Sequence, residues 1–407
     1  MSYQPPSGAR DLLPLDVAQK YWIEERLEEI FQRWGYHRII TSTVENLDTL
    51  MAGGAIAQSS VIQLQGSGPE RLGLRPELTA SIARAAVTRM AQVTYPQRLY
   101  YTANVFSRGT RGSQAGQREY YQAGVELLGT PGTLADAEIL RLLLSCVSTL
   151  QLADWRLIVG NAGLTRSLLE IFPEAVRDPV RGAIARLDRI TLETLALPDD
   201  LCQRALQMMD LRGRPQDVLQ TVSQLSLTVE QMNTVNELKS LVELLESDHQ
   251  PPLILDLSLI QSFDYYTGVV FEVVADTSQG RQVVGKGGRY DHLLSGFGPK
   301  GRSYPGIGFM LNVESLHQAL LGTGCLPEAI PPSDWLVVPK TPQAAIAAFQ
   351  YAQTIREAEA VVRVELYLEP DDAVEIIRQR ARDRHISRIA WITETQPPEI
   401  EAVSWSG

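Results

Sequence analysis

A stripe of apolar positions opens the chain. Its members recur at helical spacing and are Ile23, Leu27, Ile30, Phe31 and Trp34. This period predicts one buried face of an amphipathic helix. We expect Asp16 to cap the start of the helix and Gly35 to end it, because Asp accepts hydrogen bonds from free N–H groups and Gly adopts the left-handed conformation after a last turn. A strand is predicted to follow over residues 39–44.

The stretch 98–128 has a different pattern. Its two ends, RLYYTANVF and REYYQAGVELLG, are rich in aromatic and β-branched residues, which predicts two antiparallel strands. The polar segment SRGTRGSQAGQ joins them, and a glycine-rich loop of this kind is often functional. Residues 136–150 then predict a helix.

Residues 165–250 change in character. Segments such as RSLLEIF, LCQRALQMM and VNELKSLVELL have helical apolar spacing, which predicts a helical insertion. Strands are expected at 253–260 and 265–274, with a turn at 278–280 before the glycine-rich corner GKGGRYD. Residues 306–322 predict a strand that passes into a helix. We therefore predict a core domain over 1–326 that contains the insertion.

The end of the chain forms a separate predicted domain. Residues 327–333 are a linker by composition, and 334–407 alternate between strands (DWLVVP, VVRVELYL, RIAWIT) and helices at 342–360 and 372–384. This alternation predicts a small α/β domain. Five arginines fall at 378, 380, 382, 384 and 388, and their spacing favours a solvated helix face over a basic patch.

Composition excludes several classes of protein. The net charge is −11, which lowers the expectation of nucleic-acid binding because phosphate contacts need a basic surface. The three cysteines, Cys146, Cys202 and Cys325, form no CxxC pair, so neither a disulfide framework nor a zinc site is expected. The N-terminal segment MSYQPPSGARDLLP has no apolar core of the kind found in a signal peptide, and no run approaches the roughly 18 apolar residues of a transmembrane helix. We expect a cytoplasmic protein that does not contact membranes.

Seven motifs in order resemble the histidyl branch of the class II aminoacyl-tRNA synthetases. They are SGARDLLP, WGYHRIITSTVE, LRPELTA, REYYQAGVELLG, FDYYTGVVFE, GGRYDHL and PGIGFMLNVESL. The resemblance covers about residues 5–322 and implies an α+β fold. The implied architecture is an antiparallel sheet flanked by helices, with a helical insertion and a C-terminal α/β domain similar to a degenerate anticodon-binding domain.

The resemblance also implies a histidine pocket. An amino acid with an imidazole ring needs acids for its ammonium group, a polar partner for the ring and aromatic walls. Gln122 and Glu126 lie four apart on a predicted strand, so both side chains face the same way. Taken singly, a tyrosine or glutamate on a strand more often belongs to a packed wall or to a solvent-exposed face than to a binding site. The residues that match the family's histidine ligands are Glu77, Thr79, Arg108, Gln122, Glu126, Tyr265, Tyr266 and Tyr290.

Three departures from the synthetase pattern fall on its ATP side. Gln261 stands where the family has an arginine at the reacting carboxylate, and Ser315 stands where the arginine for the terminal phosphate is expected. In the loop after the first strand, either Arg108 or Ser107 takes the arginine position, and the acid that reads adenine is lost to Thr110 on the ungapped count. Adenylate formation needs such cations at the phosphates. No catalytic residue, metal or cofactor is therefore expected.

A chain that keeps the histidine side and loses the ATP side resembles the regulatory subunits of ATP phosphoribosyltransferase, the first enzyme of histidine biosynthesis. This implies a homodimer within a hetero-oligomer, a short-form catalytic subunit as partner and L-histidine as the feedback effector. Two alternatives stay open: an active histidyl-tRNA synthetase and a stand-alone histidine-sensing module.

Overall fold

The computed structural model describes residues 3–52, 56–65, 68–90, 92–108, 117–247, 250–259, 265–277, 280–297, 304–358, 360–369 and 372–404. The chain divides into two compact units, Met1–Pro327 and Glu328–Gly407, which are described separately. Gln261, Thr110 and two residues of the turn expected at 278–280 lie outside the described residues.

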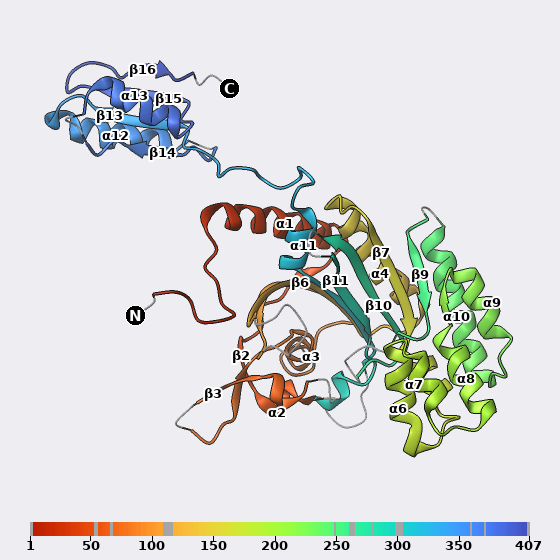
Figure 1. Ribbon diagram of the computed structural model, residues 1–407. Coiled ribbons are helices and arrows are strands. Elements are labelled where there is room, and N and C mark those ends of the chain that lie inside the picture. The colour runs from red at the N-terminus through yellow and green to blue at the C-terminus, as the bar shows by residue number, and fades with distance from the viewer. Residues whose placement is uncertain are drawn as a thin grey trace. The chain divides into compact units, whose positions relative to one another are not determined.

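A nine-stranded sheet forms the centre of the first unit (Figure 1). Its strands lie in the order β1 (His37–Arg38), β5 (Gln97–Phe106), β6 (Glu119–Leu128), β12 (Gly306–Asn312), β11 (Gly280–Arg289), β10 (Val269–Thr277), β7 (Trp155–Asn161), β9 (Leu253–Asp256) and β8 (Arg212–Gly213). Neighbours pair antiparallel except β1 with β5 and β7 with β9. The predicted antiparallel sheet is confirmed, with a parallel pair near each edge.

Two hydrophobic cores cover the two faces of this sheet, because successive strand residues point to opposite sides. Val125 and Leu127 of β6 pack into the core formed with α1 (Pro14–Arg33), α4 (Thr133–Thr149), α5 (Ala162–Leu169) and α11 (Val313–Leu320). Leu128 and Tyr101 pack into the other core, with α2 (Leu47–Leu50) and α3 (Thr79–Thr88). A small sheet of β2 (Val44–Asn46), β4 (Leu72–Leu74) and β3 (Ile62–Leu64) adjoins the second core, together with the 3₁₀ turns η2 (Gln58–Ser60) and η4 (Leu294–Gly296).

The helix-rich segment beyond α5 lies beside β9, at one edge of the sheet (Figure 1). It consists of α6 (Glu174–Ala185), α7 (Arg189–Thr194), α8 (Asp199–Met209), α9 (Pro215–Ser223) and α10 (Val229–Glu246). The segment also contains β8, a two-residue strand that its helical pattern did not predict.

Details of the first helix differ from expectation. Helix α1 begins at Pro14, and Leu13 rather than Asp16 is the N-cap. Asp16 is three residues further on, and its carboxylate accepts a hydrogen bond from the backbone N–H of Leu13 at 2.9 Å. Gly35 follows the helix with φ 79°, as predicted. The strand expected over 39–44 is wrong, since β1 ends at Arg38 and β2 begins at Val44.

The second unit holds a four-stranded sheet in the order β14 (Val364–Leu366), β13 (Trp335–Pro339), β15 (Arg388–Ile392) and β16 (Glu399–Ala402). Its helical segments are η5 (Pro342–Ala344), α12 (Ala345–Arg356) and α13 (Val374–Asp383). The edge strand β16 was not predicted, and it pairs antiparallel with β15.

Acidic neighbours pair with the basic run of this unit. Arg378 contacts Glu375 and Glu401, each at 2.7 Å, and Arg384 contacts Glu365 at 2.6 Å. These ion pairs offset much of the positive charge that the run would otherwise present. In the described part of the chain, no helix is both long enough and apolar enough to span a bilayer.

Candidate ligand-binding pocket

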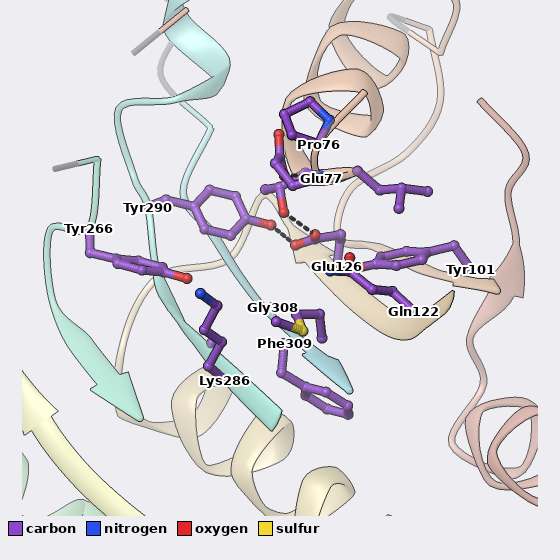
Figure 2. Close-up of a pocket in the computed structure, with 14 residues that line it drawn as sticks. Pro76, Glu77, Tyr101, Gln122, Glu126, Tyr266, Lys286, Tyr290, Gly308 and Phe309 are labelled. Carbon is purple, nitrogen blue, oxygen red and sulfur yellow. Dashed lines mark hydrogen bonds between the residues drawn. The ribbon is translucent and has the colours of Figure 1, made fainter. Parts of the chain in front are cut away.

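A cavity of about 110 Å³ lies on the α3 side of the large sheet. Figure 2 shows side chains from α3, β5, β6, β11 and β12 converging on it. The residues that line it are Pro76, Glu77, Leu78, Thr79, Tyr101, Gln122, Glu126, Tyr266, Lys286, Gly287, Tyr290, Gly308, Phe309 and Met310. Elements more than 200 positions apart in the chain thus build one site.

Six of the eight residues singled out from the sequence line this cavity: Glu77, Thr79, Gln122, Glu126, Tyr266 and Tyr290. Tyr265 lies behind them, with its ring centroid 4.7 Å from that of Tyr266 and 5.9 Å from that of Tyr290. Arg108 does not line the cavity. It is exposed, and its backbone N–H donates to the carbonyl of Ser60 at 3.1 Å.

Glu126 is the central polar group of the pocket. Its side chain is 2 % exposed, and its two carboxylate oxygens accept hydrogen bonds from the hydroxyls of Thr79, at 2.8 Å, and Tyr290. Burial raises the pKa of Glu126 to about 8, although these two hydrogen bonds act to lower it. The group can therefore hold or release a proton near neutral pH, which suits recognition of an imidazole.

Glu77 anchors the start of α3. Its carboxylate oxygens accept from the backbone N–H groups of Thr79, at 2.5 Å, and Ala80, at 2.9 Å. Burial raises the pKa of this acid as well. Because each carboxylate oxygen has two lone pairs, Glu77 can still accept a hydrogen bond from a ligand in the cavity.

Glycines make room for the pocket side chains. A methyl group on Gly306 would lie 2.3 Å from the ring of Tyr290, and one on Gly288 would lie 2.7 Å from the ring of Tyr266. Carbon atoms in contact normally stay about 3.5–4.0 Å apart. Any larger residue at these two positions would push the tyrosines out of place, so both glycines help to position the pocket tyrosines.

Lys286 and Tyr101 line the cavity and were missed by the sequence reasoning. Lys286 lies four residues before Tyr290 and two before Gly288, so strand alternation alone assigns it to the pocket face. Burial lowers the pKa of Lys286, and Glu272, its cross-strand neighbour, acts to raise it. Within the described residues, no group of three or more His, Cys, Asp or Glu side chains is placed to hold a metal.

Ser315, which stands where the synthetases have an arginine, lies in the first turn of α11. The side chain of Asn312 accepts a hydrogen bond from the backbone N–H of Ser315 at 2.8 Å and so caps the helix. Glu314 accepts from the backbone N–H of Tyr121 at 3.0 Å. Ser315 is 4 % exposed, so this position is packed into the protein.

The chain is similar to a known protein family and to named relatives. The histidyl-tRNA synthetase family matches residues 8–316. An ATP phosphoribosyltransferase regulatory subunit from Nostoc sp. PCC 7120 is 61% identical over 404 residues, which cover 99% of this chain and 100% of the relative.

Solved structures show the same fold. A protein from Bacillus halodurans described as an ATP phosphoribosyltransferase regulatory subunit/histidyl-tRNA synthetase has a TM-score of 0.80 at 26% identity, over 97% of this chain and 100% of that one. Histidyl-tRNA synthetase from Nostoc sp. PCC 7120 has a TM-score of 0.76 at 22% identity, over 96% and 91%. The 61% identity to a regulatory subunit extends over nearly the whole chain, and the fold is that of the synthetases. The chain therefore belongs to the family of ATP phosphoribosyltransferase regulatory subunits.

Proposed function

We propose that the chain is a cytoplasmic, non-catalytic subunit that binds L-histidine in this pocket and transmits feedback inhibition to a short-form catalytic subunit of ATP phosphoribosyltransferase. The observation that carries the proposal is the buried carboxyl group of Glu126, held by Thr79 and Tyr290 with a pKa raised to about 8. A buried acid that titrates near neutrality is costly to keep and is typical of a ligand site.

The chemistry of the pocket fits the imidazole ring and the ammonium group of histidine. Glu126 is placed to form a charge-assisted hydrogen bond with an imidazole nitrogen, and Tyr266 and Tyr290 supply flat apolar walls for the ring. Glu77, Thr79 and Gln122 offer oxygen acceptors for the ammonium group.

Two positions of the chain support a protein without synthetase activity. Activation of histidine by ATP needs cations at the phosphates, and Gln261 and Ser315 carry no charge. Two proteins of Nostoc sp. PCC 7120 support the same view. The sequence of this chain is 61% identical to that organism's regulatory subunit but only 22% identical to its histidyl-tRNA synthetase. These figures favour the regulatory branch over an active synthetase.

Feedback requires that histidine bind two states of the complex with different affinity, because a ligand that binds both equally shifts neither. The hydrogen bonds of Glu126 join β6 to α3, through Thr79, and to the segment directly after β11, through Tyr290. A ligand that tightens these links favours whichever state of the complex holds the three elements closest together.

The direct test is calorimetric titration with L-histidine of the wild type, Glu126→Gln and the control Glu119→Gln. Glu119 lies on the same strand but outside the cavity, and its carboxylate accepts from the side chain of Asn104 at 2.7 Å. We expect Glu126→Gln to weaken binding by roughly 10- to 100-fold, the loss expected for a hydrogen bond to a charged group. Equal affinity in all three proteins would remove the pocket assignment.

A second experiment tests the partner. The chain is co-expressed with a short-form catalytic subunit, and light scattering reports whether the complex contains this chain as a homodimer. We expect phosphoribosyl transfer to require the chain and to be inhibited by histidine. Histidine-dependent pyrophosphate exchange by the chain alone would instead identify an active synthetase. Histidine binding without complex formation would identify a stand-alone sensor.

A further inference from the structure

The charged side chains that line the pocket are distributed unevenly. Glu77 and Glu126 contribute two acids beside α3 and β6, and Lys286 contributes one cation from β11. Among the described residues around the cavity, Lys286 is the basic one. An α-amino acid carries a carboxylate that neither acid can bind favourably, so a cation on another wall is the natural partner for it.

Strand pairing places Lys286 at a suitable separation from Glu126. Lys286 pairs with Met310 of β12, and Met310 pairs with Gly124 of β6, two residues before Glu126. With strands about 4.8 Å apart and two residues spanning roughly 6.8 Å, the two backbone positions are roughly 12 Å apart. Both side chains lie on the same face of the sheet and line the cavity, so they approach a bound ligand from different strands.

The direction of the side chain agrees with this placement. Figure 2 shows the amino nitrogen of Lys286 pointing toward the hydroxyl of Tyr266, on the β11 side of the pocket, with Gln122 and Tyr101 on the other side. Met310, the cross-strand neighbour of Lys286, lines the same cavity. The lysine is therefore part of the wall, not of the outer surface.

We infer that Lys286 binds the α-carboxylate of the amino acid held in this pocket and makes the site selective for ligands with a free carboxylate. The inference rests on the proposed histidine site and adds a specificity residue to it. Glu272 lies directly opposite Lys286 on β10, which favours the charged form of the lysine. The ligand carboxylate then completes a row of alternating charges, from Glu272 through Lys286 to the ligand.

The test compares two ligands that differ only in the carboxylate. Wild type, Lys286→Met and Lys286→Arg are titrated with L-histidine and with histamine, which lacks the carboxylate. We expect Lys286→Met to weaken histidine binding by roughly 10- to 100-fold and to leave histamine binding within about twofold, because only the carboxylate contact is lost. Lys286→Arg keeps the charge and should keep most of the preference for histidine. Exposed Lys239 on α10 offers a matched control, Lys239→Met.

Structural damage is separated from loss of a contact by a second variant. Lys286→Met leaves Glu272 without its cation, so the double variant Glu272→Gln, Lys286→Met is titrated as well and should show the same ligand dependence. Equal loss of histidine and histamine affinity, or no loss of either, would overturn the role of Lys286 while the histidine site stands. A wild type that binds neither ligand would overturn the site and this inference together.

Discussion

The hydroxyl of Tyr290 donates a hydrogen bond to the carboxylate of Glu126, although the two residues are 164 positions apart in the chain. Tyr290 follows β11, and Glu126 lies on β6, with β12 between the two strands. The bond therefore joins two strands that do not pair directly. It also favours the ionised form of this acid and so opposes part of the rise in pKa that burial causes.

Removal of this hydroxyl tests the link. Tyr290→Phe keeps the aromatic ring but removes a bond that lowers the pKa of Glu126, so the pKa should rise further. We expect histidine affinity to fall by roughly 10-fold, about the value of one hydrogen bond. Tyr120→Phe is the matched control, because the hydroxyl of Tyr120 donates to the carbonyl of Gln117 and does not face the cavity. Equal histidine affinity in both variants would contradict the prediction.

Site residues could be predicted from the sequence where they lie on a regular strand, and less well elsewhere. Gln122 and Glu126 were assigned to one face of a strand by alternation alone, and both line the cavity. Arg108 could not be judged in this way, because it follows the end of β5, where alternation no longer applies, and it lies exposed. Lys286 was missed because it lies just outside the matched motif GGRYDHL. Alternation gives its face, but its distance from Glu126 depends on β11 lying two strands from β6.

The secondary structure likewise contains elements that follow from local sequence pattern and elements that depend on the rest of the fold. The strands at both ends of residues 98–128 and the helix of 313–320 were predicted because local pattern and final structure agree. The prediction that Asp16 caps α1 was wrong. The helix begins two residues earlier, at Pro14, because the fixed φ of proline suits the first helical position. Strand β16 depends on pairing with β15 rather than on a pattern of its own.

Histidine affinity is expected to be greatest between about pH 6.5 and pH 8. The imidazole ring ionises near 6.5, and the pKa of Glu126 is raised to about 8. Between these values the acid and the ring together hold one proton, which is what an ion pair between imidazolium and carboxylate requires. At lower pH a proton must leave on binding, and at higher pH one must be taken up.

Calorimetry in buffers with different ionisation enthalpies measures these protons. We expect release near pH 6, little exchange near pH 7.2 and uptake near pH 9. Glu77 and Lys286 also face the cavity, and the α-amino group of the ligand also titrates at alkaline pH. The same titration of Glu126→Gln assigns the effect: uptake near pH 9 should be smaller than in the wild type. An affinity that stays constant from pH 6 to pH 9 would count against the ion pair.

The free protein should lose stability as pH rises from about 5 to 8.5. The pKa of Glu126 is raised from 4.5 to about 8 in the folded state, so over this window the folded protein binds more protons than the unfolded chain. Linkage then makes the free energy of unfolding fall as pH rises. The raised pKa of Glu77 acts in the same direction.

Thermal melts at several pH values test this dependence. Glu126→Gln cannot ionise at this position, so its melting temperature should fall less with pH than that of the wild type, by roughly 2–4 °C for each kcal/mol of lost linkage. Glu119→Gln should keep the wild-type slope. Parallel curves for the wild type and Glu126→Gln would show that Glu126 ionises in the folded state with an ordinary pKa.

A single restored arginine should not create a synthetase. Gln261→Arg would add one cation, yet Ser315 would still leave the terminal phosphate of ATP without its partner, and adenylate formation needs both charges at once. We expect no histidine-dependent pyrophosphate exchange from Gln261→Arg. Ser315→Arg alone should be inactive as well and also less stable, because Ser315 is 4 % exposed and an arginine there would need space inside the protein. Robust exchange by Gln261→Arg alone would mean that the rest of the ATP site is intact and that the chain is one substitution away from catalysis.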